Sequence, residues 1–240
     1  MISIISAHRP ERHKFLADCY ESLRDQPGAW EWIIEIDGPL YQLASNISDD
    51  PRVSVDYTGA RLGAAAARNF ALSRATGKFI FSLDDDDILY PDCLSSLAGA
   101  LEKSQLPAAI GNAYRLSGPD QPLLAWQSHG YESDTLYRRG EDIPAGAVEA
   151  NKDSYGTHCL ASCSVFWRHE YLLSLGGWPA ITGSEDSALL ARANASSAIL
   201  HPDIDVLIYR EHPEQESADE NILRLRRRSW PLIKKMLEDG

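Results

Sequence analysis

The first hundred residues alternate between apolar runs of strand length and segments whose apolar residues recur at helical spacing. Strands that alternate with helices pair in parallel and bury both faces of their sheet, so this order predicts an α/β fold with a mostly parallel sheet flanked by helices. Open sheets of this kind bind ligands at the carboxyl ends of their strands. The expected strands are Ile2 to Ser6, Trp32 to Ile36, Val53 to Tyr57 and Phe79 to Leu83, and the expected helices are Phe15 to Leu23, Leu62 to Ala75 and Leu94 to Leu101, the last opened by Pro91.

The pattern weakens from about Tyr114 to Thr157, where glycines punctuate polar sequence and only Leu123 to Trp126 is strand-like. We interpret this stretch as a looped insertion on the substrate side. The tail from Ala218 onward is predicted to be helical in two pieces because Pro231 interrupts it. The insertion contains rings that could stack on a sugar, namely Trp126, His129, Tyr131, Tyr155 and His158. After the insertion we expect strands from Ser164 to Trp167 and from Val206 to Tyr209, with a helix from Glu185 to Ala193 between them.

Charge and composition limit the partners. The chain of 240 residues has a formal net charge of −12, which argues against broad electrostatic binding to nucleic acid or anionic lipid. The basic run Arg224 to Arg228 is accordingly interpreted as a solvated helix face. The polar start and the lack of any uninterrupted apolar run of about 18 residues predict neither a signal sequence nor an integral membrane segment. With four scattered cysteines, interpreted as reduced thiols, these features predict a cytoplasmic protein.

Four consecutive aspartates, Asp84 to Asp87, follow the fourth expected strand. Adjacent carboxylates repel one another unless a cation neutralises them. Mg²⁺ and Mn²⁺ prefer a few carboxylate oxygens, with water and substrate phosphates completing the shell. The cluster therefore predicts a divalent-cation site at a strand end. A solvated turn whose aspartates cap the helix after Pro91 is the alternative.

Residues 61–94 carry an ordered set of short motifs. They are Gly63, Ala67-Arg68-Asn69, Ala75-Thr76-Gly77, the apolar strand Phe79 to Phe81, Leu83 to Asp87, and Pro91. In this order they resemble family 2 glycosyltransferases of the GT-A fold, a Rossmann-like arrangement. The resemblance implies one GT-A domain over residues 1–213, with a nucleotide-sugar-binding half at 1–112, a looped acceptor-binding half at 113–213, and a helical tail at 214–240.

The same resemblance assigns a donor site. Asp86 is the expected direct metal ligand, and Asp84 lies nearer the ribose while serving the metal as well. Arg68 is assigned to the nucleotide, a role that its fixed charge and fork of donors suit. Gly63 belongs to the same binding set. His212, near the end of the matching region, is expected to reach the metal or the diphosphate.

The segments SIISAHRP and EWIIEIDG resemble the family's first strand with its loop and its second strand with an acidic nucleobase contact. Asp37 is therefore the candidate for the base or ribose, and Ala7 is a candidate nucleotide contact. The chain has a single aspartate before Gly38, where the family usually has Asp-Asp-Gly-Ser, and lacks the usual Pro-Thr after the first strand. A UDP-sugar is the expected donor, and because of these departures TDP- and GDP-sugars are alternatives.

Residues 175–193, LGGWPAITGSEDSALLARA, resemble the family's Gly-Gly-aromatic segment followed by Glu-Asp at a helix start. Asp186 would be the general base, since a sugar hydroxyl is a poor nucleophile until a carboxylate takes its proton. Glu185 would position the acceptor or Asp186. The alternative is structural: Thr182-x-x-Glu185 is a capping box, and acidic residues in a first helical turn are stabilised by the helix dipole.

The sequence thus predicts a metal-dependent, inverting glycosyltransferase that uses Mn²⁺ or Mg²⁺ and moves a sugar from a nucleotide donor to a hydroxyl-bearing small molecule or glycan. No nucleic-acid partner is expected, and the oligomeric state is left open. One alternative is a phosphatase of the haloacid-dehalogenase type, although such enzymes carry their Asp-x-Asp motif on the first strand. The other is a non-catalytic module that binds a sugar nucleotide or a cation, which would be expected to lose Glu185 and Asp186.

Overall fold

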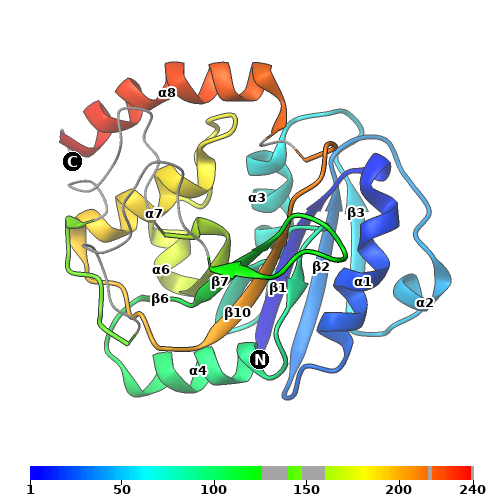
Figure 1. Ribbon diagram of the computed structural model, residues 1–240, viewed down its shortest axis with the longest axis horizontal. Helices are drawn as coiled ribbons and strands as arrows, with labels where there is room; N and C mark the ends of the chain where they lie inside the picture. The colour runs from blue at the N-terminus through cyan, green and yellow to red at the C-terminus, as the bar shows by residue number, and fades with distance from the viewer. Residues whose placement is uncertain (126–139, 148–159, 216–217, 239–240) are drawn as a thin grey trace.

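A six-stranded sheet forms the centre of the computed structural model, which describes residues 1–125, 140–147, 160–215 and 218–238 (Figure 1). The strand order is β3-β2-β1-β4-β9-β6. Neighbouring strands from β3 to β4 pair in parallel, whereas β9 runs antiparallel to both β4 and β6, so the predicted mostly parallel sheet is confirmed. The strands are β1 (Ile2–His8), β2 (Trp30–Ile36), β3 (Val53–Tyr57), β4 (Phe79–Ser82), β6 (Ala108–Ile110) and β9 (Val165–Arg168).

Helices cover both faces of this sheet, which explains why its strands read as continuous apolar runs. Ile4 of β1 packs with the apolar residues of α1 and α4, and its neighbour Ile5 packs with those of α3, α6 and α7, because successive side chains point to opposite faces. The helices are α1 (His13–Arg24), α2 (Ser45–Ser48), α3 (Ala64–Arg74), α4 (Cys93–Lys103), α6 (His169–Ser174), α7 (Glu185–Ser196) and α8 (Glu220–Glu238), with 3₁₀ turns at Pro10–Arg12 and Ser162–Ser164.

A second, four-stranded sheet was not predicted from the sequence. Its order is β5-β10-β7-β8, formed by Ile88–Leu89, Asp205–Arg210, Asn112–Leu116 and Leu124–Ala125. Strand β5 directly follows the loop after β4 and pairs with β10. The second sheet therefore brings β10 beside that loop. Of the expected insertion, the strand at Leu124–Ala125 is confirmed; the candidate stacking residues Trp126, His129, Tyr131, Tyr155 and His158 lie outside the described residues.

Two expectations about proline were wrong. Helix α8 runs continuously through Pro231. Proline fixes φ at a value that a helix accepts, and packing against the body on both sides of Pro231 compensates for the lost hydrogen bond: Arg226 Nε donates to the carbonyl of Gly183 at 2.6 Å, and Ile233 is buried. Pro91 does not open α4, which begins at Cys93 after a turn. In the described part of the chain, no helix is both long and apolar enough to cross a membrane.

Candidate active site

The predicted site residues gather at the carboxyl ends of the central parallel strands. Ala7 is the second-last residue of strand β1, Asp37 directly follows β2, and Asp84 follows β4 after one residue. The backbone N–H of Asp37 donates to the carbonyl of His8 at 2.8 Å, which ties the ends of β1 and β2 together. This edge is where an open α/β sheet binds its ligand.

The carboxylate of Asp37 holds the start of α3. It accepts hydrogen bonds from the backbone N–H of Leu62 at 2.7 Å and of Gly63 at 3.1 Å. Gly63 has a φ of 91°, a left-handed value that favours glycine, and it immediately precedes α3. Asp37 is nearly fully buried, so its structural role is to fix the Gly63 turn on the strand ends. A contact of Asp37 with a nucleobase stays a prediction.

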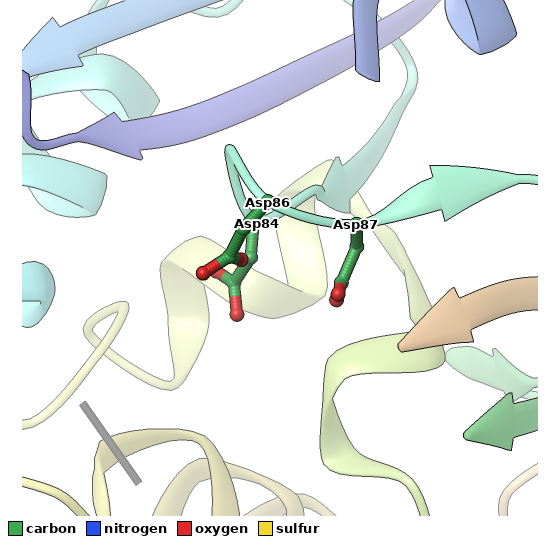
Figure 2. A group of neighbouring side chains, drawn as sticks. All are labelled: Asp84, Asp86 and Asp87. Carbon is green, nitrogen blue, oxygen red and sulfur yellow. The ribbon is translucent and has the colours of Figure 1, made fainter. Parts of the chain in front are cut away.

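The acidic loop after β4 is largely buried. Asp85, Asp86 and Asp87 are at most 5% exposed, so the alternative of a solvated turn is wrong. Figure 2 shows Asp84, Asp86 and Asp87 pointing to the same side of the loop. One oxygen from each of these three lies within 4.8 Å of the others, a spacing that suits one divalent cation with hard oxygen ligands.

Two basic side chains contact the carboxylate of Asp86. Arg12 Nη1 lies 2.6 Å and His212 Nε2 lies 3.0 Å from the same oxygen, Asp86 Oδ2. His212 thus contacts the acidic loop, while its expected contact with a metal or a diphosphate stays a prediction. The ring of His212 packs on Phe15 with the ring centroids 4.1 Å apart, which fixes its direction.

Asp85 and Asp87 point to other partners. Asp85 is fully buried and accepts a hydrogen bond at 2.7 Å from Nδ1 of His8, which is also fully buried. Asp87 accepts the backbone N–H of Arg210 at 3.1 Å, and the Arg210 side chain donates to the carbonyl of Asp86. The second oxygen of Asp87 is buried without a hydrogen-bond partner among the described residues, which leaves a ligand atom for a cation.

Arg68 connects the two halves of the candidate site. It is buried in α3, and its guanidinium donates to Asp84 at 2.6 Å and to Glu185 at 2.9 Å, 117 residues further along the chain. A third carboxylate, Asp186, lies 3.3 Å from the same guanidinium. A planar fork of donors suits this bridging. The acidic loop and the Glu-Asp pair predicted separately from the sequence therefore form one site.

Asp186 is held from the side opposite Arg68 by Trp178. The indole Nε1–H donates to Asp186 Oδ1 at 2.7 Å. Trp178 is itself fixed by two backbone hydrogen bonds with the Asn69 side chain, at 2.9 and 2.8 Å. A Cβ atom on Gly177 would stand 2.3 Å from the oxygen of that side chain, so only glycine fits. The Gly-Gly-aromatic segment thereby orients Asp186.

The capping-box alternative for Glu185 is wrong. Helix α7 begins at Glu185, its N-cap is Ser184 and not Thr182, and no side chain caps the helix. The carboxylate of Glu185 instead pairs with Arg68 in the interior. These contacts place Glu185 and Asp186 in the candidate site rather than in a purely local helix cap.

Burial raises the pKa of Asp186 to about 7. The charge of Arg68 opposes the rise, whereas the carboxylates of Glu185 and Asp84 add to it. A carboxylate with a pKa near neutrality is suited to accept a proton from a hydroxyl, because the ideal pKa of a general base lies near the working pH. The direction of this pKa shift agrees with the role predicted for Asp186.

The carboxylates of the acidic loop differ in the direction of their pKa shifts. Burial alone would raise the pKa of Asp84, but the charge and hydrogen bond of Arg68 outweigh it and hold the pKa below its usual value. Burial raises the pKa of Asp87 well above its usual value, and the charges of Asp86 and Asp84 raise it further. Burial also raises the pKa of Asp86, with Arg12 opposing and the neighbouring aspartates adding. A bound cation would relieve this mutual repulsion.

Four contacting residues escaped the sequence analysis: His8, Arg12, Trp178 and Arg210. Arg12 ends the 3₁₀ turn Pro10–Arg12 after β1, which is too short to show a periodic pattern. Arg210 stands two residues before His212, and only the histidine was selected from this part of the sequence. The spacing of the motifs indicated the acidic residues of the candidate site, but it did not indicate which other side chains would contact their carboxylates.

Comparison with known proteins gives a family match. Residues 3–170 match the family model described as glycosyl transferase family 2. The putative teichuronic acid biosynthesis glycosyltransferase TuaG of Bacillus subtilis is 36% identical over 141 residues, which cover 56% of this chain and 55% of that protein. The glycosyltransferase GlyG of Streptococcus pneumoniae is 30% identical over 112 residues, 45% of this chain and 37% of GlyG. The chain therefore spans about half or less of the length of these curated relatives.

Solved structures agree on the fold. A fragment of TarS from S. aureus in complex with UDP-GlcNAc superposes with a TM-score of 0.67 at 16% identity, covering 94% of this chain and 65% of that one. The mannosyltransferase PcManGT from Pyrobaculum calidifontis, in complex with GDP-Man and Mn²⁺, gives a TM-score of 0.62 at 16% identity, covering 100% of this chain and 64% of that one. The expected GT-A fold is confirmed.

Proposed function

The chain belongs to glycosyl transferase family 2, and from that premise we propose that it moves a sugar from a nucleoside-diphosphate donor to a hydroxyl group of an acceptor. One observation carries the proposal. Arg68 joins Asp84 of the acidic loop to Glu185 and Asp186 at the start of α7. One buried guanidinium therefore bridges the group that we propose to bind the donor and the group that we propose to take the proton.

For the donor side, we propose that Ala7, Asp37, Gly63, Arg68 and Asp84 bind the nucleotide. They lie at or beside the carboxyl ends of the parallel strands. Two structural neighbours were solved with UDP-GlcNAc and with GDP-Man, which supports a sugar nucleotide as the ligand class. A UDP-sugar is the preferred donor, with TDP- and GDP-sugars as alternatives.

For the metal, we propose that Asp86 and Asp84 hold Mn²⁺ or Mg²⁺, with His212 beside them. The fit rests on oxygens within 4.8 Å of one another and on the unpartnered Asp87 oxygen among the described residues. The complex of the mannosyltransferase contains Mn²⁺. A divalent cation there would supply positive charge to the departing diphosphate.

For the chemistry, we propose that Asp186 removes the proton of the acceptor hydroxyl and that Glu185 positions Asp186 or the acceptor. Trp178 fixes the direction of the Asp186 carboxyl group, and a pKa of about 7 lets it accept a proton near neutral pH. The acceptor oxygen then attacks the anomeric carbon opposite the leaving diphosphate. A single displacement of this kind inverts the anomeric centre.

We further propose that residues 1–112 bind the donor and residues 113–213 the acceptor, which is a small molecule or a glycan, with residues 214–240 as a helical tail. A cytoplasmic location stays a prediction. The free, buried thiols of Cys19 and Cys93 accord with a reducing compartment.

Slow hydrolysis of sugar nucleotides provides the test. The protein is incubated with Mn²⁺ and a panel of UDP-, TDP- and GDP-sugars, and release of nucleoside diphosphate is followed beside the Asp86→Asn and Asp25→Asn variants. Asp25 is exposed at the remote end of α1, so it controls for the same change of charge. We expect release by the wild type and Asp25→Asn, and none by Asp86→Asn. Cleavage of small phosphate esters, with no action on sugar nucleotides, would indicate a phosphatase instead.

A further inference from the structure

Helix α8 carries charge of the opposite sign to the rest of the protein. Its 19 residues include six arginines and lysines and two acidic residues, Glu220 and Glu238, which stand at its ends, so its net charge is +4. The whole chain carries −12, and everything outside α8 therefore carries −16. The molecule has one positive helix on a negative body.

The side of α8 that faces the body is fixed by specific contacts. Arg226 Nε donates to the carbonyl of Gly183 at 2.6 Å, and Ile233 is 2% exposed and packs with Ala188 of α7. Ile222 lies so close to Gly183 that a Cβ there would stand 2.6 Å from its methyl group. Ile222, Arg226 and Ile233 follow helical spacing and lie on one face. The rotation of α8 about its own axis is therefore set.

The opposite face of α8 is a row of exposed cations. Arg224, Arg228 and Lys235, which we call the basic stripe, are exposed and recur at positions i, i+4 and i+11. Arg227 is exposed beside them. At 1.5 Å per residue the basic stripe is about 16 Å long. Within it the helix has no acidic residue, so a flat anionic surface would meet positive charge along its whole length.

The position of α8 decides which kind of surface can use the basic stripe. Figure 1 shows α8 along one edge of the molecule. A helix is about 10 Å in diameter, roughly one Debye length at physiological salt, so a plane touching α8 is largely screened from the negative body behind it. A nucleic acid is less suited, because affinity for it grows with the number of phosphates that Lys and Arg neutralise, and the basic stripe offers three cations.

We propose that the basic stripe docks the protein on an anionic lipid surface. Each Lys or Arg near such a surface contributes about 1 kcal/mol, and the contact is electrostatic because Ile222 and Ile233 of α8 pack on the protein body. Helix α8 packs on α7, whose first residues are Glu185 and Asp186. Docking would hold the acceptor side of the candidate site beside the lipid surface. The net charge of −12 opposes broad lipid binding, and the fold confines the contact to one helix.

Vesicle co-sedimentation tests the proposal on the full chain, with chelator present so that no divalent cation bridges carboxylates to lipid. The probe is vesicles of phosphatidylglycerol and phosphatidylcholine, compared with phosphatidylcholine alone. The test variant combines Arg224→Gln, Arg228→Gln and Lys235→Gln. The matched control combines Arg24→Gln, Lys78→Gln and Lys103→Gln, three exposed cations outside α8; Lys103 ends α4 at the opposite edge in Figure 1.

We expect the wild type and the control to bind the anionic vesicles at low salt and to leave phosphatidylcholine unbound. The stripe variant should bind about 100-fold more weakly, the factor that corresponds to about 1 kcal/mol for each of three cations. Circular dichroism and thermal melting of both variants check that they are folded. Equal binding by the two triple variants, no binding by the wild type, or equally tight binding of wild type to duplex DNA would each overturn the proposal.

Discussion

Replacing Asp186 by asparagine separates chemistry from structure more cleanly than any other substitution in the candidate site. Asparagine keeps the shape of the side chain and an oxygen that can accept the hydrogen bond from Trp178 Nε1, now 2.7 Å from Asp186 Oδ1. It cannot accept a proton at neutral pH. Loss of general-base assistance should lower turnover by roughly 10²- to 10⁴-fold, while affinity for the donor stays near that of the wild type.

The same substitution should change stability in a pH-dependent way. Burial raises the pKa of Asp186 from 3.8 to about 7. This rise means that the folded protein disfavours the ionised carboxylate by at most about 4 kcal/mol relative to the unfolded chain. As pH rises from about 4 to about 7, the unfolded chain loses this proton while the folded chain keeps it. The contribution of Asp186 to wild-type stability therefore falls across that window and is level above it. Asparagine does not titrate, so the stability of Asp186→Asn relative to wild type should rise across the window.

Two assays check these expectations. Turnover is measured at saturating donor and acceptor, and urea unfolding is followed at pH 4.5 and pH 8 for the metal-free wild type and variant. A loss of activity together with a relative gain of stability at the higher pH is the expected pattern. Turnover within about threefold of wild type would refute the role as base, and a stability difference that does not change with pH would refute the buried, proton-retaining carboxyl group.

Three further predictions follow from the geometry. Asp86→Ala should abolish Mn²⁺-dependent donor binding yet leave the thermal melting temperature of the metal-free protein unchanged or higher, since it removes one charge from a self-repelling loop; unchanged affinity by calorimetry would contradict this. The product should have the inverted anomeric configuration, and an NMR spectrum showing the donor's own configuration would exclude direct displacement. Gly177→Ala should lower the free energy of unfolding by about 1–3 kcal/mol and lower turnover, because φ of Gly177 is +70° and the new Cβ would stand 2.3 Å from the side-chain oxygen of Asn69. Urea unfolding and initial rates equal to those of the wild type would show that the support of Asp186 by Trp178 is dispensable.

In the central sheet, β1, β2 and β4 were predictable because they are buried on both faces, and the edge strand β3 because its apolar residues alternate with polar ones. Strand β3 matches its expected range, and β1, β2 and β4 differ from theirs by at most a few end residues. The second sheet escaped prediction because β5 has two residues, too few to show a period, and because no local pattern shows that the expected strands near β8 and β10 would join one sheet. Its strands depend on pairing with β10 rather than on their own patterns.

The candidate site was predictable as two separate acidic motifs but not as one assembly. The Arg68 to Glu185 contact joins residues 117 positions apart, a distance that no local pattern reports. Arg12 was missed for a related reason, since the 3₁₀ turn Pro10–Arg12 is too short for a pattern to show that the side chain of Arg12 will meet Asp86. Pro231 shows the reverse case, in which tertiary packing overrides a correct local rule.

The most direct test of the account is a crystal soaked with Mn²⁺ and UDP, with the metal located by anomalous scattering. We expect a manganese peak on a carboxylate oxygen of Asp86, with the diphosphate bound to the same ion and the nucleoside lying over the ends of β1 and β2, beside Asp37. A manganese ion bound away from the Asp84 to Asp87 loop, or UDP bound without contact to that loop, would contradict the claim that these aspartates form the donor site of a glycosyltransferase.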